Sequence, residues 1–400
     1  MIRRPPRSTL DRSSAASDVY KRQIINPFIV MDIMERANSI EQKGQTVVHM
    51  EVGQPGTSAP EAAKDFLKKA MEDNPMGYTV ALGLPDLRKK IAELYGDWYG
   101  LDVDWNRIII TGGSSAGFIL AFTALFDKLD KVGLANPGYP SYRQIMKTLN
   151  LDPVLINTTE KNKFQPTPTD LSPYNINGLL IASPGNPTGS MIDREVLEAL
   201  VNYCADRKIS LISDEIYHGI QYDMQPSTVL EFSDNCYIIN SFSKYFSMTG
   251  WRIGWIVVPK EHVRIVERIQ QNMFICASHA SQILAIGAFE GKVELEKNLM
   301  TYRENRENLL NALPEFGFNN IAPPDGAFYL YVDISKFSSD SYDFVKKMLD
   351  VGGVAITPGI DFDPINGKSK IRLSYARSTP EILNGIERIK IFMKEKKYLQ

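Results

Sequence analysis

The middle of the chain alternates short apolar runs with segments of helical spacing, and this alternation restricts the fold more than any other feature. Between the runs lie segments such as 193–207, whose apolar positions recur every three to four residues. Uninterrupted apolar strands separated by helices indicate a mainly parallel sheet that is covered on both faces. We expect strands at 108–111, 132–135, 179–182, 210–213, 237–240 and 256–258.

Segments rich in glycine, proline and polar residues follow these expected strands. In a parallel sheet of this type, ligands collect at the carboxyl ends of the strands. The sequence therefore predicts a binding site along one edge of the sheet, built from the segments 111–117, 136–142, 183–189, 214–217 and 241–252.

Composition excludes several other classes of protein. The 400 residues are 44% hydrophobic and 23% charged, which is typical of a soluble globular protein. A net charge of -2 gives no indication of nucleic acid or an anionic membrane as a partner. No apolar run approaches the ~20 residues that cross a bilayer. The three cysteines and four histidines are scattered, so we expect a reduced, cytoplasmic protein without a metal site.

The chain divides into parts of different texture. Residues 1–23 are rich in arginine and serine and have no apolar periodicity, so we interpret them as a disordered, non-native leader. A helix opening near Pro27 and a strand at 47–52 follow. We expect 24–56 to join a small α+β domain formed mainly by 291–400, and 57–290 to form a large domain. In the small domain, helices are expected at 292–313 and 341–350.

The segment 241–252 carries the most specific chemistry. Lys244 would form an imine with an aldehyde, as covalent catalysis by a lysine amine requires. Ser241 and Ser243 would donate hydrogen bonds to a phosphate, and Arg252 would hold that phosphate through two parallel hydrogen bonds. These residues predict a site for an aldehyde cofactor that carries a phosphate.

This segment resembles the lysine segment of the pyridoxal-phosphate-dependent aminotransferases of fold type I, class I/II. The resemblance implies an α/β fold, in which a mainly parallel, seven-stranded sheet lies between helices in the large domain. It also implies a pyridoxal 5'-phosphate cofactor held by Lys244 as a Schiff base. The expected reaction moves an amino group from an L-amino acid to a 2-oxo acid in two ping-pong half-reactions, with the freed Lys244 amine as general base.

The resemblance assigns further residues to the cofactor's phosphate and ring. Gly112, Gly113 and Ser114 follow a strand and open a helix, where free N–H groups bind anions, and the family places the phosphate there. Tyr139 matches the aromatic residue that stacks on the cofactor ring. Tyr78 matches a residue that crosses a homodimer interface to the partner's phosphate.

Two more segments match positions around the cofactor ring. Asn186 lies in a rigid Pro- and Gly-rich loop and would donate a hydrogen bond to the cofactor's phenolic oxygen. Asp214 would pair with the ring nitrogen and keep it protonated, because a nearby anion favours the charged form. Tyr217 would share the phenolic oxygen with Asn186.

The substrate residues that the resemblance implies are Gly53, Asn186 and Arg372. Arg372 would hold the α-carboxylate through a two-point fork, with a backbone N–H from Gly53. Family members specific for acidic substrates use a second arginine, and the comparable stretch 272–281 contains none. A neutral or apolar substrate side chain is favoured instead by Phe28, Phe274, Ile275 and His279.

Four alternatives to transamination remain open from the sequence. Carbon–sulfur lyases, a cyclopropane-forming synthase and a few cofactor-bound regulators share the same residue set. A more remote alternative is an α/β-hydrolase, because residues 113–117 also fit G-x-S-x-G. Ser115 would then be the nucleophile, with a histidine such as His262 or His279. This alternative leaves the Lys244 segment unexplained.

Overall fold

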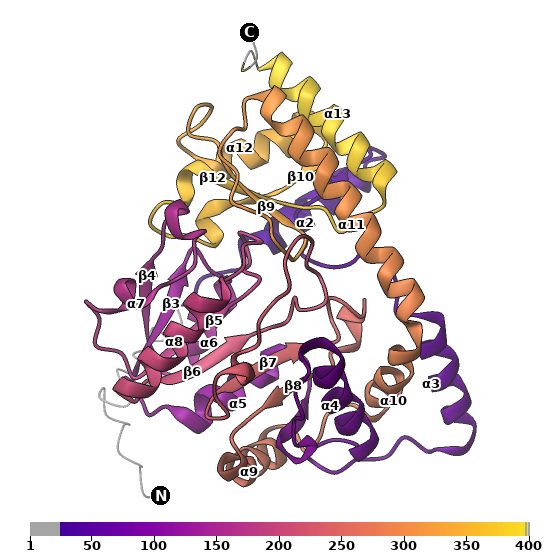
Figure 1. Cartoon of the computed structure of the whole chain (residues 1–400). Coiled ribbons are helices and arrows are strands. Elements are labelled where there is room, and N and C mark those ends of the chain that lie inside the picture. The colour runs from indigo at the N-terminus through magenta and orange to yellow at the C-terminus, as the bar shows by residue number, and fades with distance from the viewer. Residues whose placement is uncertain (1–24, 397, 399–400) are drawn as a thin grey trace, which may run out of the picture.

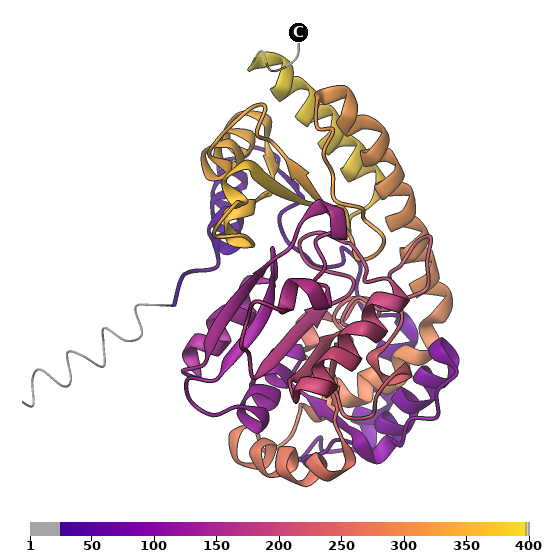
Figure 2. The same ribbon diagram turned by 60° about the vertical axis from the view of Figure 1, so that its left-hand side comes forward.

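The structure is a computed structural model that describes residues 25–396 and residue 398. The expected leader at 1–23 lies outside the described residues. Two bodies are visible in Figures 1 and 2: a larger one around the main sheet, and a smaller one formed by the orange and yellow C-terminal elements together with the indigo helix α2. None of the helices in the described part has the length and apolarity needed to cross a membrane.

A seven-stranded sheet forms the centre of the larger body, in the order β2-β8-β7-β6-β5-β3-β4. β8 is antiparallel to both neighbours, and the other pairs are parallel. The expected mainly parallel, seven-stranded sheet is therefore confirmed. Its strands are β2 Ile108–Thr111, β3 Lys131–Asn136, β4 Asp152–Asn157, β5 Gly178–Ala182, β6 Ser210–Asp214, β7 Tyr237–Ser241 and β8 Gly254–Val257.

β4 is the strand of this sheet that was not predicted from the apolar pattern. It opens with Asp152 and Pro153, residue types that are depleted in strands, and only three apolar residues follow. β4 pairs with β3 alone, so it lies at the edge of the sheet, where a proline that cannot donate a ladder hydrogen bond is tolerated.

Helices cover both faces of this sheet. Ile108 and Ile110 on β2 belong to one buried apolar cluster, with residues of α3, α4, α8 and α10. Ile109, between them, belongs to another cluster, with residues of α5, α6 and α9. The period of two along a strand thus sends neighbouring residues to opposite layers. These helices are α3 Glu61–Asp73, α4 Pro85–Tyr99, α5 Ser114–Leu125, α6 Pro140–Thr148, α7 Pro168–Leu171, α8 Arg194–Arg207, α9 Val263–Met273 and α10 His279–Ala288.

The smaller body contains elements from both ends of the described chain. β1 pairs with β10, and β11, β12 and β9 form an antiparallel sheet. The helix α11 runs from the larger body up to the smaller one (Figure 1). The elements are α2 Ile29–Glu41, β1 Val48–His49, α11 Lys292–Ala312, β9 Tyr329–Asp333, α12 Ser341–Lys347, β10 Val354–Ala355, β11 Thr357–Pro358, β12 Lys370–Ser374 and α13 Thr379–Glu395.

Two expected elements of the smaller body are shorter than the sequence indicated. The strand expected at 47–52 is limited to Val48–His49, because β10 offers only two residues to pair with. The helix expected at 341–350 ends at Lys347, and a π-helical turn follows it. Ile33, Val48 and Met50 share a buried cluster with the C-terminal elements, so we propose the division into 24–56 with 291–400, and 57–290.

Candidate active site

A cavity of about 200 Å³ lies where the carboxyl ends of the central strands meet the smaller body. Its walls come from the start of α5, from the segments after β5, β6 and β7, from the N-terminal segment around Phe28, and from β12. Ten of the residues predicted from the sequence line this one cavity: Gly53, Ser114, Tyr139, Asn186, Asp214, Tyr217, Ser243, Lys244, Arg252 and Arg372.

Lys244 follows the end of β7 and faces the cavity. Its Nζ donates a 2.5 Å hydrogen bond to the backbone carbonyl of Gly53. Burial lowers the pKa of Lys244 to about 7, and the positive charges of Arg372 and Arg252 act in the same direction, while Asp214 opposes them. Near neutral pH a large share of this amine is therefore uncharged, as a nucleophile or a base must be.

Asp214 is the last residue of β6 and is 4% exposed. Its carboxylate accepts hydrogen bonds from the Tyr142 hydroxyl and, at 3.2 Å, from the backbone N–H of Ile216. Burial raises the pKa of Asp214 to about 6, and these two hydrogen bonds and the charge of Lys244 limit the rise. A buried carboxylate of this kind would be stabilised by a cationic group in the cavity.

Tyr217 and Tyr329 meet at their hydroxyl groups, with 2.6 Å between the two oxygens. Tyr217 follows β6, whereas Tyr329 begins β9 in the smaller body. The Arg372 guanidinium lies over the Tyr329 ring, 4.4 Å from its centroid. A Cβ atom at Gly53 would lie 1.9 Å from the Tyr329 hydroxyl, so glycine is required there.

Arg372 is 2% exposed and connects several parts of the site. Its Nη1 donates to Asn186 Oδ1 at 2.9 Å, and its Nη2 donates to the Glu51 carbonyl and, at 3.3 Å, to Thr357 Oγ1. Its buried Nε has no hydrogen-bond partner among the described residues. A buried guanidinium with an unused N–H suits a carboxylate ligand.

The helix α5 begins at Ser114, and Gly113 caps it with φ at 79°. A Cβ atom at Gly113 would lie 2.5 Å from Nη2 of Arg252, so the glycine leaves room for that guanidinium beside the helix start. Ser243 lines the same corner of the cavity. Free N–H groups, a guanidinium and a hydroxyl together form a donor set that suits a phosphate.

Ser241 lies one layer behind this corner. Its hydroxyl donates to the Ile253 carbonyl at 2.9 Å, and its oxygen accepts the Ser243 N–H at 3.1 Å. Ser243 Oγ also lies 2.8 Å from Ser241 Oγ. The geometry favours Ser243 as the direct phosphate donor and Ser241 as its support.

Four predicted residues lie on the surface rather than in the cavity of the same chain. Tyr78 is 83% exposed, and Phe274 and Ile275 are 37% and 51% exposed. His279 Nδ1 lies 2.9 Å from the carbonyl of Gly77, next to Tyr78. Tyr78 and His279 thus belong to one patch on the outside of the larger body. Gly112 is also exposed, immediately before Gly113.

Similarity to known proteins agrees with this site. The family model for aminotransferase class I and II matches residues 45–389. The chain belongs to the class I and II aminotransferases.

Relatives of known name match over nearly the whole chain. The valine–pyruvate aminotransferase of Mycobacterium tuberculosis is 43% identical over 93% of this chain and 97% of its own length. The (5-formylfuran-3-yl)methyl phosphate transaminase of Methanocaldococcus jannaschii is 37% identical over 92% and 96%. A crystal structure of an aminotransferase from Mycobacterium tuberculosis superposes with a TM-score of 0.91 at 42% identity, covering 94% of this chain and 98% of that one.

Aminotransferases of this family depend on pyridoxal phosphate, and the described residues fit that group. The start of α5 with Arg252 and Ser243 offers donors for the phosphate. Asp214 offers a buried carboxylate for the ring nitrogen, and Lys244 offers an amine of lowered pKa for the aldehyde. The expected cofactor and the expected transaminase class are thereby confirmed, while the role of each residue stays a prediction.

The hydrolase alternative finds no support at Ser115. This serine is exposed in the first turn of α5, on the wall of the same cavity. His262 contacts the Tyr237 hydroxyl at 2.9 Å and His279 contacts Gly77, so the hydrogen bonds of both candidate histidines go elsewhere. Membership of the aminotransferase family excludes this alternative.

Two tyrosines that line the cavity, Tyr142 and Tyr329, were not assigned a role from the sequence. Tyr142 lies within the segment 136–142, which was singled out for Tyr139. A tyrosine in a helix or strand is most often a packing residue, and spacing along one chain does not show which hydroxyl it meets. Only the fold brings Tyr142 to Asp214 and Tyr329 to Tyr217.

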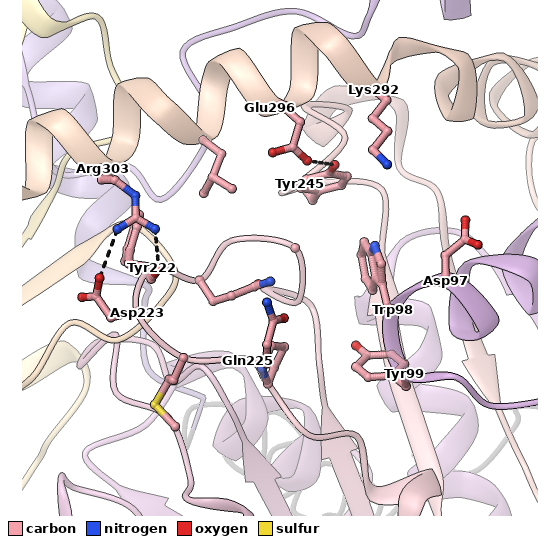
Figure 3. Close-up of a pocket in the computed structure, with 15 residues that line it drawn as sticks. Asp97, Trp98, Tyr99, Tyr222, Asp223, Gln225, Tyr245, Lys292, Glu296 and Arg303 are labelled. Carbon is pink, nitrogen blue, oxygen red and sulfur yellow. Dashed lines mark hydrogen bonds and ion pairs between the residues drawn. The ribbon is translucent and has the colours of Figure 1, made fainter.

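A second cavity, of about 560 Å³, lies between the end of α4, the segment 219–226 and α11 (Figure 3). Tyr99 and Trp98 form one side, and Lys292, Glu296 and Arg303 project from α11 on the other (Figure 3). None of the predicted site residues lines this second cavity.

Proposed function

We propose that this aminotransferase takes its amino group from an L-amino acid with a neutral, apolar side chain and passes it to a short 2-oxo acid in two ping-pong half-reactions. The observation that carries the proposal is the cavity itself, in which the Lys244 amine, with a pKa of about 7, lies between the Asp214 carboxylate and the Arg372 guanidinium.

Lys244 moves the proton. When bound, pyridoxal phosphate supplies an aldehyde carbon that exchanges amines and a ring that accepts the electrons of the broken Cα–H bond. In its neutral form, Lys244 would accept the substrate's Cα proton on Nζ and give that proton back within the same cavity. A pKa of about 7 lets the same amine take up and release that proton near neutral pH.

Asp214 and the residues around it adjust the charge in the cavity. Asp214, which accepts a hydrogen bond from the Tyr142 hydroxyl, would hold a proton on the cofactor's ring nitrogen. Tyr217 and Asn186 would donate hydrogen bonds to the phenolic oxygen, and the Tyr217 hydroxyl is itself held by Tyr329. Tyr139 would pack against the ring.

Arg372 orients the substrate. Its guanidinium, held by Asn186 and by the Glu51 carbonyl, binds the α-carboxylate, and Gly53 contributes a backbone N–H. Holding the α-carboxylate on Arg372 would fix the orientation of Cα, so that the Cα–H bond, and not the bond to the carboxylate, would be aligned for cleavage. Transamination is then favoured over decarboxylation.

The substrate class follows from the lining of the cavity. Phe28, Val30, Met31 and Val52 from the N-terminal segment form an apolar wall. Among the described lining residues the cations are Lys244, Arg252 and Arg372, and each already has a role, so none remains for a side-chain carboxylate. The name of the Mycobacterium tuberculosis relative supports valine as donor and pyruvate as acceptor.

The exposed side chains of Tyr78, Phe274 and Ile275 support a homodimer. Exposed large apolar side chains are found at protein interfaces. We propose that Tyr78 crosses this interface to the partner's phosphate and that the apolar residues complete the partner's substrate pocket. The separated, free cysteines Cys204, Cys236 and Cys276 support a cytoplasmic location.

A panel of amino donors tests the function. L-valine, L-leucine, L-alanine and L-aspartate are each mixed with the cofactor-loaded enzyme and with pyruvate or 2-oxoglutarate, and the new oxo acid is measured. We expect the highest kcat/KM for L-valine, and no turnover in the Lys244→Ala variant. A preference for L-aspartate would contradict the apolar pocket. Release of sulfide from L-cysteine without an oxo acid would favour the carbon–sulfur lyase.

A further inference from the structure

His218 is a buried histidine that lies directly behind the catalytic cavity, one residue after Tyr217. Its side chain is 0% exposed, and both ring nitrogens are occupied. Nε2 lies 2.8 Å from the Ser183 carbonyl, and Nδ1 contacts the Tyr99 hydroxyl. Because a carbonyl only accepts, Nε2 carries the proton and Nδ1 accepts from Tyr99.

The surroundings keep this ring neutral. Burial lowers the pKa of His218 to about 4, and the hydrogen bond to Ser183 only partly offsets that. Glu215 Oε2 is 3.5 Å from Nδ1, which is long for a hydrogen bond. The other oxygen of Glu215 accepts from Thr228 and from the backbone of Val229. His218 therefore acts as a fixed donor at one end and a fixed acceptor at the other.

The donor end holds the loop that presents Asn186. Within the loop, the Gly185 N–H donates to the Ser190 carbonyl at 2.9 Å, and the Gly189 N–H donates to the Gly185 carbonyl at 2.8 Å. These bonds shape the loop. At its start the Ser183 N–H donates to the Asp214 carbonyl at 3.3 Å, and at its end the Gly326 N–H donates to the Gly189 carbonyl at 2.8 Å. His218 adds a side-chain hydrogen bond of 2.8 Å to the Ser183 carbonyl, from the turn that follows β6 and carries Tyr217.

We propose that His218 is a positioning residue, whose Nε2–H fixes the Ser183–Gly189 loop so that Asn186 meets Arg372 and completes the site for the substrate's α-carboxylate. The path is short: two residues lie between Ser183 and Asn186, and Asn186 Oδ1 accepts from Arg372 Nη1 at 2.9 Å. This inference rests on the proposed role of Arg372 and extends it to a residue that touches neither substrate nor cofactor.

Tyr99 forms the outer end of the same hydrogen-bonded chain. It is the last residue of α4 and lies on the wall of the second cavity, near Trp98 (Figure 3). Its hydroxyl holds the His218 ring in the orientation that points Nε2 at Ser183. The Tyr99→Phe variant keeps the ring and removes only this hydroxyl, so it should loosen the loop less than loss of the histidine does.

Two amide substitutions distinguish the effect of the hydrogen-bond donor at Nε2 from the effect of side-chain volume. In His218→Gln the amide nitrogen occupies the place of Nε2, and in His218→Asn it occupies the place of Nδ1, so only the first preserves the donor to Ser183. With the cofactor-loaded enzyme, we expect KM for both L-valine and pyruvate to rise about tenfold in His218→Asn, the effect of one lost hydrogen bond. KM should stay within about threefold of the wild-type value in His218→Gln, and in both variants kcat should change less than KM.

Two further readouts do not depend on turnover. Isovalerate, an unreactive carboxylate of the substrate's shape, should bind about tenfold more weakly to His218→Asn, by calorimetry. Amide exchange of the segment 183–189 in the cofactor-free chain should be faster in His218→Asn and Tyr99→Phe than in His218→Gln. The exchange result stands even if the donor panel contradicts the proposed substrate.

Equal increases in KM in His218→Gln and His218→Asn would overturn the proposal, because they would show that the volume of the ring matters and its hydrogen-bond donor does not. Unchanged KM, isovalerate affinity and exchange in a folded His218→Asn variant would also overturn it. If that variant does not fold, Tyr99→Phe decides: a rise in KM of about threefold with faster exchange at 183–189 is expected, and wild-type values of both would refute the positioning role.

Discussion

Arg372 and Asn186 are 186 residues apart in the sequence and are joined by a 2.9 Å hydrogen bond from Nη1 to Oδ1. Arg372 lies on β12 of the smaller body, and Asn186 lies on the loop after β5 of the larger one. The proposed α-carboxylate site is therefore assembled from both bodies. Any movement of one body against the other changes the distance between these two side chains.

Replacing Arg372 by lysine tests this assembly. Lysine keeps the positive charge but loses the planar fork, so it cannot bind Asn186 and a carboxylate together. We expect KM for L-valine and for pyruvate to rise about 100-fold, the loss of a bidentate ionic hydrogen bond. Steady-state kinetics with both substrates measure the change. A KM within threefold of the wild-type value would show that the carboxylate binds elsewhere.

The Tyr329 hydroxyl is predicted to tune Tyr217. In Tyr329→Phe the ring stays under Arg372, but the Tyr217 hydroxyl loses its 2.6 Å partner. We expect kcat to fall about tenfold, as for one lost hydrogen bond, with little change in KM. Tyr331→Phe, a neighbouring buried tyrosine whose hydroxyl has no hydrogen-bond partner among the described residues, is the matched control and should keep wild-type kcat. Equal kcat in both variants would contradict the role of Tyr329.

Asp214 is predicted to weaken the cofactor-free fold while serving catalysis. Burial raises its pKa from 3.8 to about 6, so the unfolded chain ionises first as pH rises. Ionisation of Asp214 therefore lowers the free energy of unfolding of the cofactor-free protein. This decrease is absent below pH 3.8, grows as the pH rises through about 6, and is complete above that. A shift of this size corresponds to about 3 kcal/mol.

Asp214→Asn should therefore be more stable than the wild type by about 3 kcal/mol at pH 8 in urea unfolding of the cofactor-free proteins. The difference should shrink as the pH is lowered towards 4. Its turnover should fall by more than about 100-fold, because a neutral amide does not hold a proton on the ring nitrogen. If the variant is less stable than the wild type at pH 8, the folded cofactor-free protein stabilises the charged Asp214 carboxylate, which would contradict this prediction.

The pH dependence of turnover should report on Lys244. Its pKa is lowered to about 7, so the amine is neutral above that pH and protonated below it. With saturating L-valine, we expect kcat to be constant above pH 8 and to fall towards tenfold per unit well below pH 7. Stopped-flow measurement of the first half-reaction isolates this step. A rate that is flat between pH 5.5 and 8.5 would mean that another group moves the proton.

Much of the fold could be predicted because its strands are buried on both faces. The apolar runs of β2, β3, β5, β6, β7 and β8 are visible in the sequence for that reason. The edge strand β4 is only partly buried, so its sequence carries less of that signal. The end of β1 could not be predicted either, since it depends on a two-residue partner more than 300 residues away.

The site could be predicted where a motif fixes both residue type and backbone. Lys244 and Asn186 follow strand ends in Ser-rich or Gly- and Pro-rich segments, Asp214 ends a strand, and the structure brings all three to one cavity. Contacts between the two bodies could not be predicted in this way, because no sequence motif marks them. The hydrogen bonds of Tyr329 with Tyr217 and of Arg372 with Asn186 depend on how β9 and β12 pack over the larger body. His218 is a further case, since its partners Tyr99 and Ser183 are distant in sequence.

Covalent attachment at Lys244 is the most direct measurement. The enzyme is loaded with pyridoxal phosphate, reduced with borohydride and digested, and the peptides are weighed by mass spectrometry. We expect the mass of the reduced phosphopyridoxyl group on the peptide that contains Lys244, and no labelled peptide from Lys244→Arg. A group attached to any other lysine, or full labelling of Lys244→Arg, would contradict the catalytic site described above.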